Sequence, residues 1–149
     1  MRVIENVLSA CPVLVLRVGQ WMFDKIRILV GYDDSLQSRK ALTEATAIAK
    51  HFSGFIKVVN VYEKGKEKEA ETTIIEAKQN LEKEDVAHDV SLVLGSNPAK
   101  ALVVIAKQEN FGLIVIGNRG LGSKLSFLLG SVSKQVVVNA YCNVLVVKN

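Results

Sequence analysis

The segment GNRGLGSKLSFLLGSVS, residues 117–133, combines four glycines and four serines with two basic side chains, Arg119 and Lys124. Glycine lets a backbone approach a ligand closely, because it has no Cβ atom. The unpaired N–H groups at the start of a helix carry partial positive charge and favour phosphate. The composition therefore suits a cradle for a phosphate group and also an ordinary surface loop, and the residue types alone leave both interpretations open.

Two well-known phosphate-binding signatures do not fit this chain. A P-loop requires G-x-x-x-x-G-K-[ST], and the GSK of residues 122–124 lacks the earlier glycine spacing. A Rossmann fingerprint requires G-x-G-x-x-G soon after the first strand, where this chain has GYDDSLQS, residues 31–38. A phosphate site in this protein must therefore be of another kind.

Metal and catalytic chemistry have little support in the sequence. The two cysteines, Cys11 and Cys142, form no CxxC pair, and with His51 and His88 they are too few for a zinc site, so no metal ligand is predicted. No Ser-His-Asp arrangement or carboxylate pair is placed by spacing, so no catalytic residue is predicted. An ATPase built on this chain would have to rely on Mg²⁺ and a positioned water molecule.

The elements that must position residues 117–133 follow from the hydrophobic pattern. Pro98 is expected to begin a helix, because proline suits the first helical position, and Gly54 is expected to end the helix at residues 36–52. The valines of residues 131–140 have strand propensity, but their i, i+4, i+8 spacing favours helix. Apolar runs predict strands at residues 26–32, 55–62, 88–95, 112–117 and 143–148, with helices at 36–52, 67–84, from 98, and 131–140.

Five strands that alternate with four helices predict a doubly wound α/β fold with a five-stranded parallel sheet. Ligands of such sheets bind beyond the carboxyl ends of the strands, where the strand order reverses. Residues 117–133 begin at such a carboxyl end. The predicted fold therefore puts the glycine-rich segment where a ligand would bind.

The first residues of the chain repeat its ending. CPVLVLR, residues 11–17, matches CNVLVVK, residues 142–148, and the upstream residues 2–10 have helical apolar spacing. We interpret residues 1–24 as the last helix and strand of a preceding similar domain with a linker, and residues 25–149 as a complete domain; chance similarity of short strands is the alternative. Twin strands paired about a two-fold axis would run antiparallel and hold the two cysteines too far apart for a disulfide, so both are expected to remain thiols.

Composition narrows the function further. The 149 residues are 49% hydrophobic and 23% charged, as in an ordered globular domain, and the net charge of +4 comes from interleaved lysine and glutamate. Nucleic-acid binding is not expected, because aromatic residues are few and do not alternate with basic ones. Glu5 and Pro12 argue against a secretion signal, no apolar run approaches the ~18 residues of a membrane span, and a reducing, cytoplasmic location is expected.

The glycine spacing has a closer match. Gly117-x-x-Gly120, followed by nine residues and Gly130-Ser131, is the G-2x-G-9x-G-[S/T] pattern of the ATP-binding branch of the universal stress protein family, which the chain resembles from residue 25 to its end. ILVGYDDS looks like the family's first strand with its Asp-x-Ser, GSNPAKALVVIAK resembles its strand-Gly-x-Pro-helix passage, and NVLVVK resembles its closing strand. The resemblance implies the adenine nucleotide alpha hydrolase-like form of the predicted fold.

The resemblance also implies a site and a function. It implies that Asp33 and the main chain at Val61 hold adenine and ribose. It implies that the phosphates are surrounded by Gly117, Arg119, Gly120, Gly130, Ser131, Val132 and Ser133. The ligand would be ATP, AMP or ADP, alone or with Mg²⁺, and the protein a stress-related nucleotide-responsive module that forms a homodimer or higher oligomer through its last strand. Without the resemblance, Asp33 would be read as a helix N-cap or first-turn acid.

The chain departs from the family pattern at two places. Asn118 stands where serine or threonine is common, which is harmless if that position contributes only backbone. The connection after the second strand is short and rich in lysine, which would leave one wall of the pocket open. Two alternatives remain: a slow Mg-dependent ATPase, and a regulatory or scaffold half of a tandem stress protein that holds no nucleotide.

Overall fold

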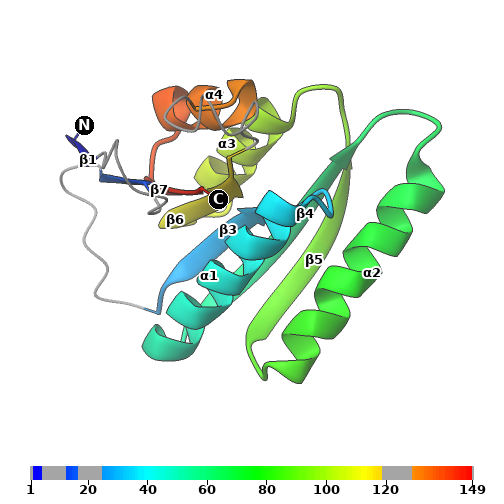
Figure 1. Ribbon diagram of the computed structural model, residues 1–149, viewed down its shortest axis with the longest axis horizontal. Coiled ribbons are helices and arrows are strands. Elements are labelled where there is room, and N and C mark those ends of the chain that lie inside the picture. Colours follow the sequence, from blue (N-terminus) through cyan, green and yellow to red (C-terminus); the bar gives the residue numbers. More distant parts are fainter. Residues whose placement is uncertain (1, 5–12, 17–24, 119–128, 149) are drawn as a thin grey trace.

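The computed structural model describes residues 2–4, 13–16, 25–118 and 129–148 (Figure 1). Within these residues the chain forms a seven-stranded sheet that is covered by helices on both faces. The strands are β1 (Arg2–Ile4), β2 (Val13–Leu16), β3 (Arg27–Gly31), β4 (Phe55–Tyr62), β5 (Ala87–Leu94), β6 (Leu113–Gly117) and β7 (Asn143–Val147). The helices are α1 (Leu36–Phe52), α2 (Glu67–Lys83), α3 (Pro98–Gln108) and α4 (Ser131–Asn139).

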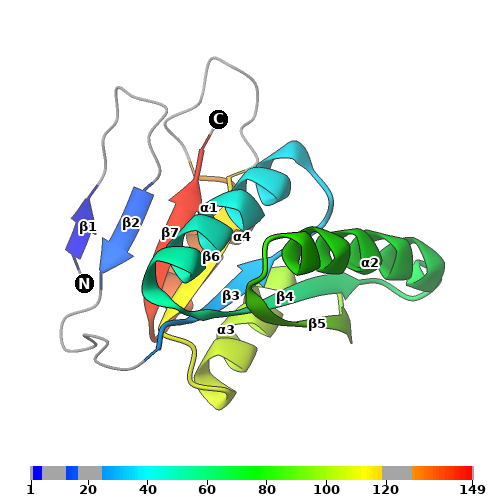
Figure 2. The same ribbon diagram turned by 90° about the horizontal axis from the view of Figure 1, so that it is seen from below.

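Five of the strands are parallel and lie in the order β7-β6-β3-β4-β5, which confirms the predicted doubly wound α/β fold. β3 lies in the middle, β4 and β5 extend the sheet on one side, and β6 and β7 extend it on the other (Figure 2). The direction of winding therefore reverses between β3 and β6, and a crevice is expected beyond their carboxyl ends. α4 also confirms that the valines of residues 136–138 belong to a helix.

Two hydrophobic cores fill the spaces between the sheet and its helices. α1 and α2 cover one face, whereas α3 and α4 cover the other (Figure 1). β3 contributes to both cores: Ile28 and Val30 pack with α1 and α2, Leu29 packs with α3 and α4, and all three side chains are 0% exposed. A strand that is covered on both faces cannot alternate apolar and polar residues, which explains the unbroken apolar run at this position.

The amino-terminal residues extend the sheet beyond β7 (Figure 2). β2 pairs antiparallel with β7, with Val13 opposite Val146 and Leu14 opposite Leu145. When CPVLVLR is aligned with CNVLVVK, Leu14 corresponds to Leu145 itself. The register of β2 on β7 is therefore the register that two copies of β7 would adopt about a two-fold axis at Leu145.

The expected helix at the start of the chain is wrong for the residues that the structure describes there. Residues 2–4 form the strand β1, which pairs antiparallel with β2. An apolar stretch this short has no decisive period, and the outer edge of β2 offers backbone partners that complete a strand. The remainder of the expected helix, residues 5–10, lies outside the described residues.

The end of α1 depends on two adjacent residues rather than on Gly54 alone. Ser53 adopts the left-handed conformation, with φ of 50°, and caps the helix through its N–H on the Ala49 carbonyl. Gly54 has no positive φ, but a Cβ atom at this position would lie 2.8 Å from the carbonyl oxygen of Ile26. Gly54 also donates its N–H to the Ala49 carbonyl at 2.7 Å, so it shares the helix-ending role with Ser53 and in addition lets the chain approach the start of β3.

Two further expectations concern the cysteines and the membrane. Cys142 is a buried thiol in the core under α3 and α4, as expected, whereas Cys11 lies outside the described residues. Within the described part of the chain, every helix is too short or too polar to cross a bilayer.

Candidate functional site

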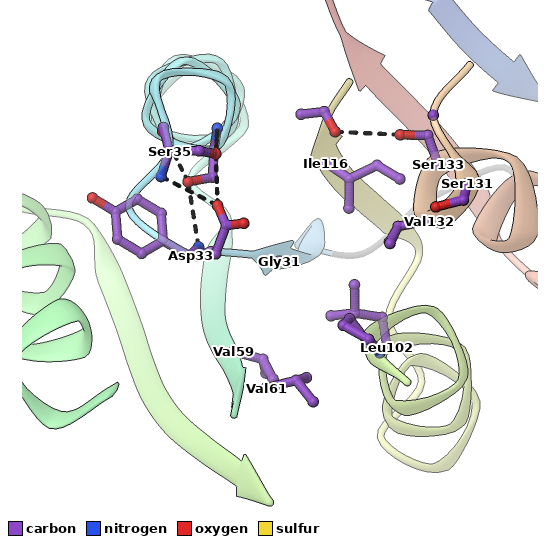
Figure 3. A pocket seen from close by; sticks show the side chains of 15 residues that line it. Gly31, Asp33, Ser35, Val59, Val61, Leu102, Ile116, Ser131, Val132 and Ser133 are labelled. Atoms are coloured by element: carbon purple, nitrogen blue, oxygen red, sulfur yellow. Dashed lines mark hydrogen bonds between the residues drawn. The ribbon is translucent and has the colours of Figure 1, made fainter. Parts of the chain in front are cut away.

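A cavity of about 480 Å³ opens at the carboxyl ends of β3, β4 and β6, where the winding reverses (Figure 3). This volume lies within the range of sites for small organic ligands. The first turns of α1, α3 and α4 form its other walls. The described residues that line it are Gly31, Tyr32, Asp33, Ser35, Ser38, Val59, Val61, Pro98, Leu102, Ile116, Gly117, Gly130, Ser131, Val132 and Ser133.

Asp33 lies at this cavity, at the exposed turn between β3 and α1. One carboxylate oxygen, Oδ1, accepts hydrogen bonds from the Ser35 hydroxyl at 2.6 Å and from the Ser35 N–H at 3.2 Å (Figure 3). The N-cap of α1 is Ser35, whose hydroxyl accepts from the Ser38 N–H. The capping role considered for Asp33 therefore belongs to Ser35, which in turn holds the Asp33 carboxylate in place.

Tyr32 is anchored beside this turn. Its ring is 3% exposed, and its hydroxyl donates to the Asp34 carboxylate, which also accepts a 2.8 Å hydrogen bond from Arg39. Burial, and next the negative charge of Asp34, raise the pKa of Tyr32 to about 12. The hydrogen bond from Arg39 lowers the pKa of Asp34. Asp34 has φ of 63°, a conformation that aspartate tolerates better than most residues.

The raised pKa of Tyr32 predicts a loss of stability in alkali. The folded state keeps the phenol proton up to about pH 12, whereas the unfolded chain releases it near pH 10, so the stabilisation is complete below pH 10 and is lost as pH rises through 12. Tyr32→Phe should remove about 2 kcal/mol of this alkaline loss. Urea unfolding at pH 9 and pH 12 measures the loss, with the exposed Tyr141→Phe as control; equal losses in both variants would contradict the assignment.

The main chain of Val61 faces the cavity because β3 is shorter than β4. β3 ends at Gly31, opposite Val59, so no residue of β3 lies opposite Val61. Val59 and Val61 present their N–H and C=O groups to the same side of β4, since neighbouring residues of a strand alternate. The Val59 carbonyl accepts from the Tyr32 N–H at 2.9 Å, on the β3 side, whereas the Tyr62 carbonyl accepts from the Gly95 N–H, on the β5 side. After Tyr32 the chain turns into α1, so the polar main-chain groups of Val61 point toward the space beyond β3.

The two glycine-marked turns meet at the same cavity. The Asn118 side-chain oxygen accepts a 2.7 Å hydrogen bond from the Gly130 N–H, and the Ser133 hydroxyl donates to the Gly117 carbonyl at 3.3 Å. Asn118 is 3% exposed, and its N–H donates to the Val147 carbonyl. Asn118 thus contributes its side chain as well as its backbone, and it joins the end of β6 to the start of α4.

The first turn of α4 offers main-chain donors that no described side chain caps. Gly130 is the N-cap, in an extended conformation with φ of −62°, and it provides no side-chain cap; the first turn carries no acidic residue. The amides of Ser131, Val132 and Ser133 are the first in the helix and lack intrahelical acceptors. Together with the helix dipole they favour a negatively charged group at this end of the cavity.

Gly117 is needed for a reason that its glycine-rich context did not reveal. A Cβ atom at this position would lie 2.5 Å from the Gln37 carbonyl carbon and 2.6 Å from the Gln37 oxygen. These are backbone atoms of the first turn of α1, so they cannot move aside as the end of a side chain could. Gly117 therefore lets α1 pack against the end of β6, in addition to lining the cavity.

Gly117→Ala should consequently destabilise the fold. We expect the free energy of unfolding to fall by about 2–3 kcal/mol, at the upper end of the range for overpacking. Gly95→Ala is the matched control, because its Cβ would lie 3.7 Å from Val61 Cγ1, an ordinary contact, and should change stability by less than about 1 kcal/mol. Chemical denaturation of both variants tests the assignment, which a stable Gly117→Ala protein would contradict.

Of the residues predicted for the site, seven lie at the cavity and two cannot be located. Arg119 and Gly120 fall outside the described residues, as does Lys124. The seven at the cavity are Asp33, Val61, Gly117, Gly130, Ser131, Val132 and Ser133. The hydroxyl of Ser133 is engaged with the Gly117 carbonyl, so only its N–H remains for the role that was expected.

Sequence reasoning missed several residues of the cavity wall. Gly31 ends β3, Ser35 and Ser38 begin α1, and Pro98 and Leu102 come from α3. Ser35, two positions after Asp33, was a signal that could have been used, because an N-cap beside a strand end points into the crevice. Leu102 had no such signal, since its apolar position on α3 is equally consistent with the core.

The fold and the cavity define the class: a doubly wound α/β domain with a ligand-sized cavity at its switch point. Residues 26–148 match the family model described as the universal stress protein family. The chain is 35% identical over 133 residues to a universal stress protein of Thermus aquaticus, and the match covers 81% of this chain and 97% of the relative. The chain therefore belongs to the universal stress protein family.

Solved structures agree with this assignment. A universal stress protein in complex with cAMP is 25% identical, with a TM-score of 0.69, over 82% of this chain and 96% of that one. A universal stress protein of Archaeoglobus fulgidus is 26% identical, with a TM-score of 0.73. That match covers 95% of this chain but 50% of the longer structure.

Proposed function

We propose that this protein binds an adenine nucleotide in the cavity at the carboxyl ends of β3, β4 and β6, and acts as a nucleotide-responsive module. The observation that carries the proposal is the convergence of three groups on one cavity of about 480 Å³. They are the uncapped first turn of α4, the main chain of Val61 and the Asp33 carboxylate. These groups match the phosphate, the polar edge of a base and the ribose hydroxyls.

The wall chemistry supports the same ligand. Val59, Val61, Leu102, Ile116 and Val132 supply apolar surface beside these polar groups, as a flat heterocyclic base requires. A solved relative of 25% identity was obtained in complex with cAMP, which is itself an adenine nucleotide. The G-2x-G-9x-G-[S/T] spacing adds Arg119 and Gly120 to the proposed phosphate site.

We treat the protein as a binding module, and the rival function is that of an ATPase. Asp33 is the one carboxylate among the described lining residues, and Ser35 already engages it. Mg²⁺ held through nucleotide phosphates needs few protein ligands, so the proposal includes the Mg-nucleotide. When bound, the ion would neutralise phosphate charge, while the chain's own groups hold base and ribose.

Calorimetry on the full chain tests this function. Titration with AMP and with ATP, each with and without Mg²⁺, should show saturable binding; no heat from any of them would favour the scaffold alternative. Phosphate release is measured in parallel. Turnover well above ~1 per second, an ordinary enzymatic rate, would establish an ATPase instead.

The amino-terminal segment is proposed to occupy the dimerisation edge of its own domain. β2 lies on β7 in the register of a symmetric β7–β7 pair, and its sequence repeats that of β7. The match to half of a longer universal stress protein, over 95% of this chain, supports residues 1–24 as the end of a preceding domain. The expected homodimer through the last strand would then form only when β2 leaves β7.

A further inference from the structure

A second cavity, also of about 480 Å³, lies between α3 and α4. We call it the α3–α4 groove. Its described lining is Asn97, Ala99, Lys100, Val103, Val104, Lys107, Gln135, Asn139 and Tyr141. None of these residues lines the cavity at the carboxyl ends of the strands, so the groove is a separate feature.

The groove is positively charged and contains no carboxylate among its described lining residues. The charged residues of α3 and α4 are Lys100, Lys107 and Lys134. Glu109, which follows α3, is engaged by Lys57 at 2.8 Å. Within the described part of the chain, no carboxylate lies within ion-pair distance of the three lysines, although lysines elsewhere form such pairs.

The lining of the groove also includes apolar and aromatic side chains. Lys107 holds its ammonium 4.3 Å from the centre of the Tyr141 ring, a cation–π contact that orients both side chains. Tyr141 is 57% exposed and Val104 is 41% exposed, so apolar surface borders the lysines. Cationic and apolar groups on one concave surface match a ligand that is both anionic and apolar.

We propose that the α3–α4 groove is a docking site for an acidic peptide segment of a partner protein, with an apolar side chain between its carboxylates. Lys100 and Lys107 pair with the carboxylates, while Val104 and Tyr141 contact the apolar side chain. Charge complementarity selects this occupant, since every ionic group of the groove's described lining is cationic. Nucleic acid suits the groove less well, because its non-specific binding depends on neutralising phosphates with Lys and Arg, and the described lining supplies two lysines and no arginine.

Fluorescence anisotropy with the full-length protein tests the proposal. The probe is a short fluorescein-labelled peptide of glutamates around one central leucine. Wild-type protein should bind it saturably, and Lys100→Glu with Lys107→Glu should weaken binding by about tenfold or more. The matched control is Lys64→Glu with Lys68→Glu, which changes the net charge equally at two exposed positions, one before α2 and one in its first turn, and should leave the affinity within about twofold.

Several outcomes would overturn the docking site. Equal loss in both double variants would show a general charge effect, and absence of binding by wild-type protein would remove the site itself. Tyr141→Ala should weaken binding to the leucine peptide but not to an all-glutamate peptide, which separates the apolar contact from a purely ionic one; equal effects on both peptides would contradict it. Stronger binding of a single-stranded oligonucleotide than of the peptide, or self-association that the lysine variants abolish, would assign the groove to those occupants instead.

Discussion

Replacement of Gly130 by valine is expected to lower the affinity for adenine nucleotides by about a hundredfold or more. Gly130 begins α4 beside the amides proposed to hold phosphate, and a branched side chain there would keep the phosphate from reaching them. The loss of two charge-assisted hydrogen bonds corresponds to a change of this size. Calorimetric titration with AMP and Mg-ATP measures it.

The backbone of Gly130 makes this a clean experiment. Its φ of −62° and ψ of 164° lie in the extended region, which valine adopts without strain, so the fold should survive. Gly130→Ala should give an intermediate loss, because its methyl group blocks less of the approach. Val138→Ala, on the exposed far end of the same helix, should leave the affinity unchanged. Wild-type affinity in a folded Gly130→Val protein would refute the phosphate site.

The second large effect concerns the edge of β7. We expect the wild-type protein to have the mass of one chain, and a variant with Leu14→Pro and Val15→Pro to form a dimer instead. Consecutive residues of a strand direct their N–H groups to opposite neighbours, so the two prolines together remove pairing on both sides of β2. Because β2 belongs to the same chain, it competes with a second molecule for the edge of β7 at an effective concentration on the order of millimolar. The loss of β2 exposes this apolar edge, and β7 of a second molecule can then pair with it.

Light scattering on a sizing column, over a range of protein concentrations, measures this change. Leu14→Val retains its N–H and should keep the mass of one chain. Addition of a synthetic peptide of residues 1–17 to the proline variant should restore that mass, which distinguishes specific pairing from aggregation of an unfolded protein. A proline variant that keeps the mass of one chain at every concentration would show that β7 is not a self-association edge.

Much of the fold was predictable from local patterns. The range of β4, residues 55–62, is the predicted one, and the other strands of the parallel sheet differ by one residue at most at either end. Such strands are buried on both faces, so they produce unbroken apolar runs that contrast with amphipathic helices. Residues 2–4 were assigned wrongly because an apolar run of that length has no clear period, and pairing with β2 decided its conformation.

The glycines and serines of the candidate site were predictable from the sequence, but the contacts that hold their turns in place were not. The spacing of Gly117, Gly130 and Ser131 indicated two turns that could serve one anion. It did not indicate that Asn118 joins these turns through its side chain, or that Gly117 is required by the backbone of Gln37. The latter contact joins residues 80 positions apart in the chain.

By itself, the sequence determined the strands of the parallel sheet, its helices and the end of the sheet where a ligand would bind. These follow from periodicity, which reflects the burial of each element separately. Only the tertiary structure decided that β2 lies on β7 of the same chain, that α3 and α4 leave a cationic groove between them, and that Ser35 rather than Asp33 caps α1. Such features depend on contacts between distant residues, and the free energy of those contacts is set by close packing and hydrogen-bond geometry that no local pattern contains.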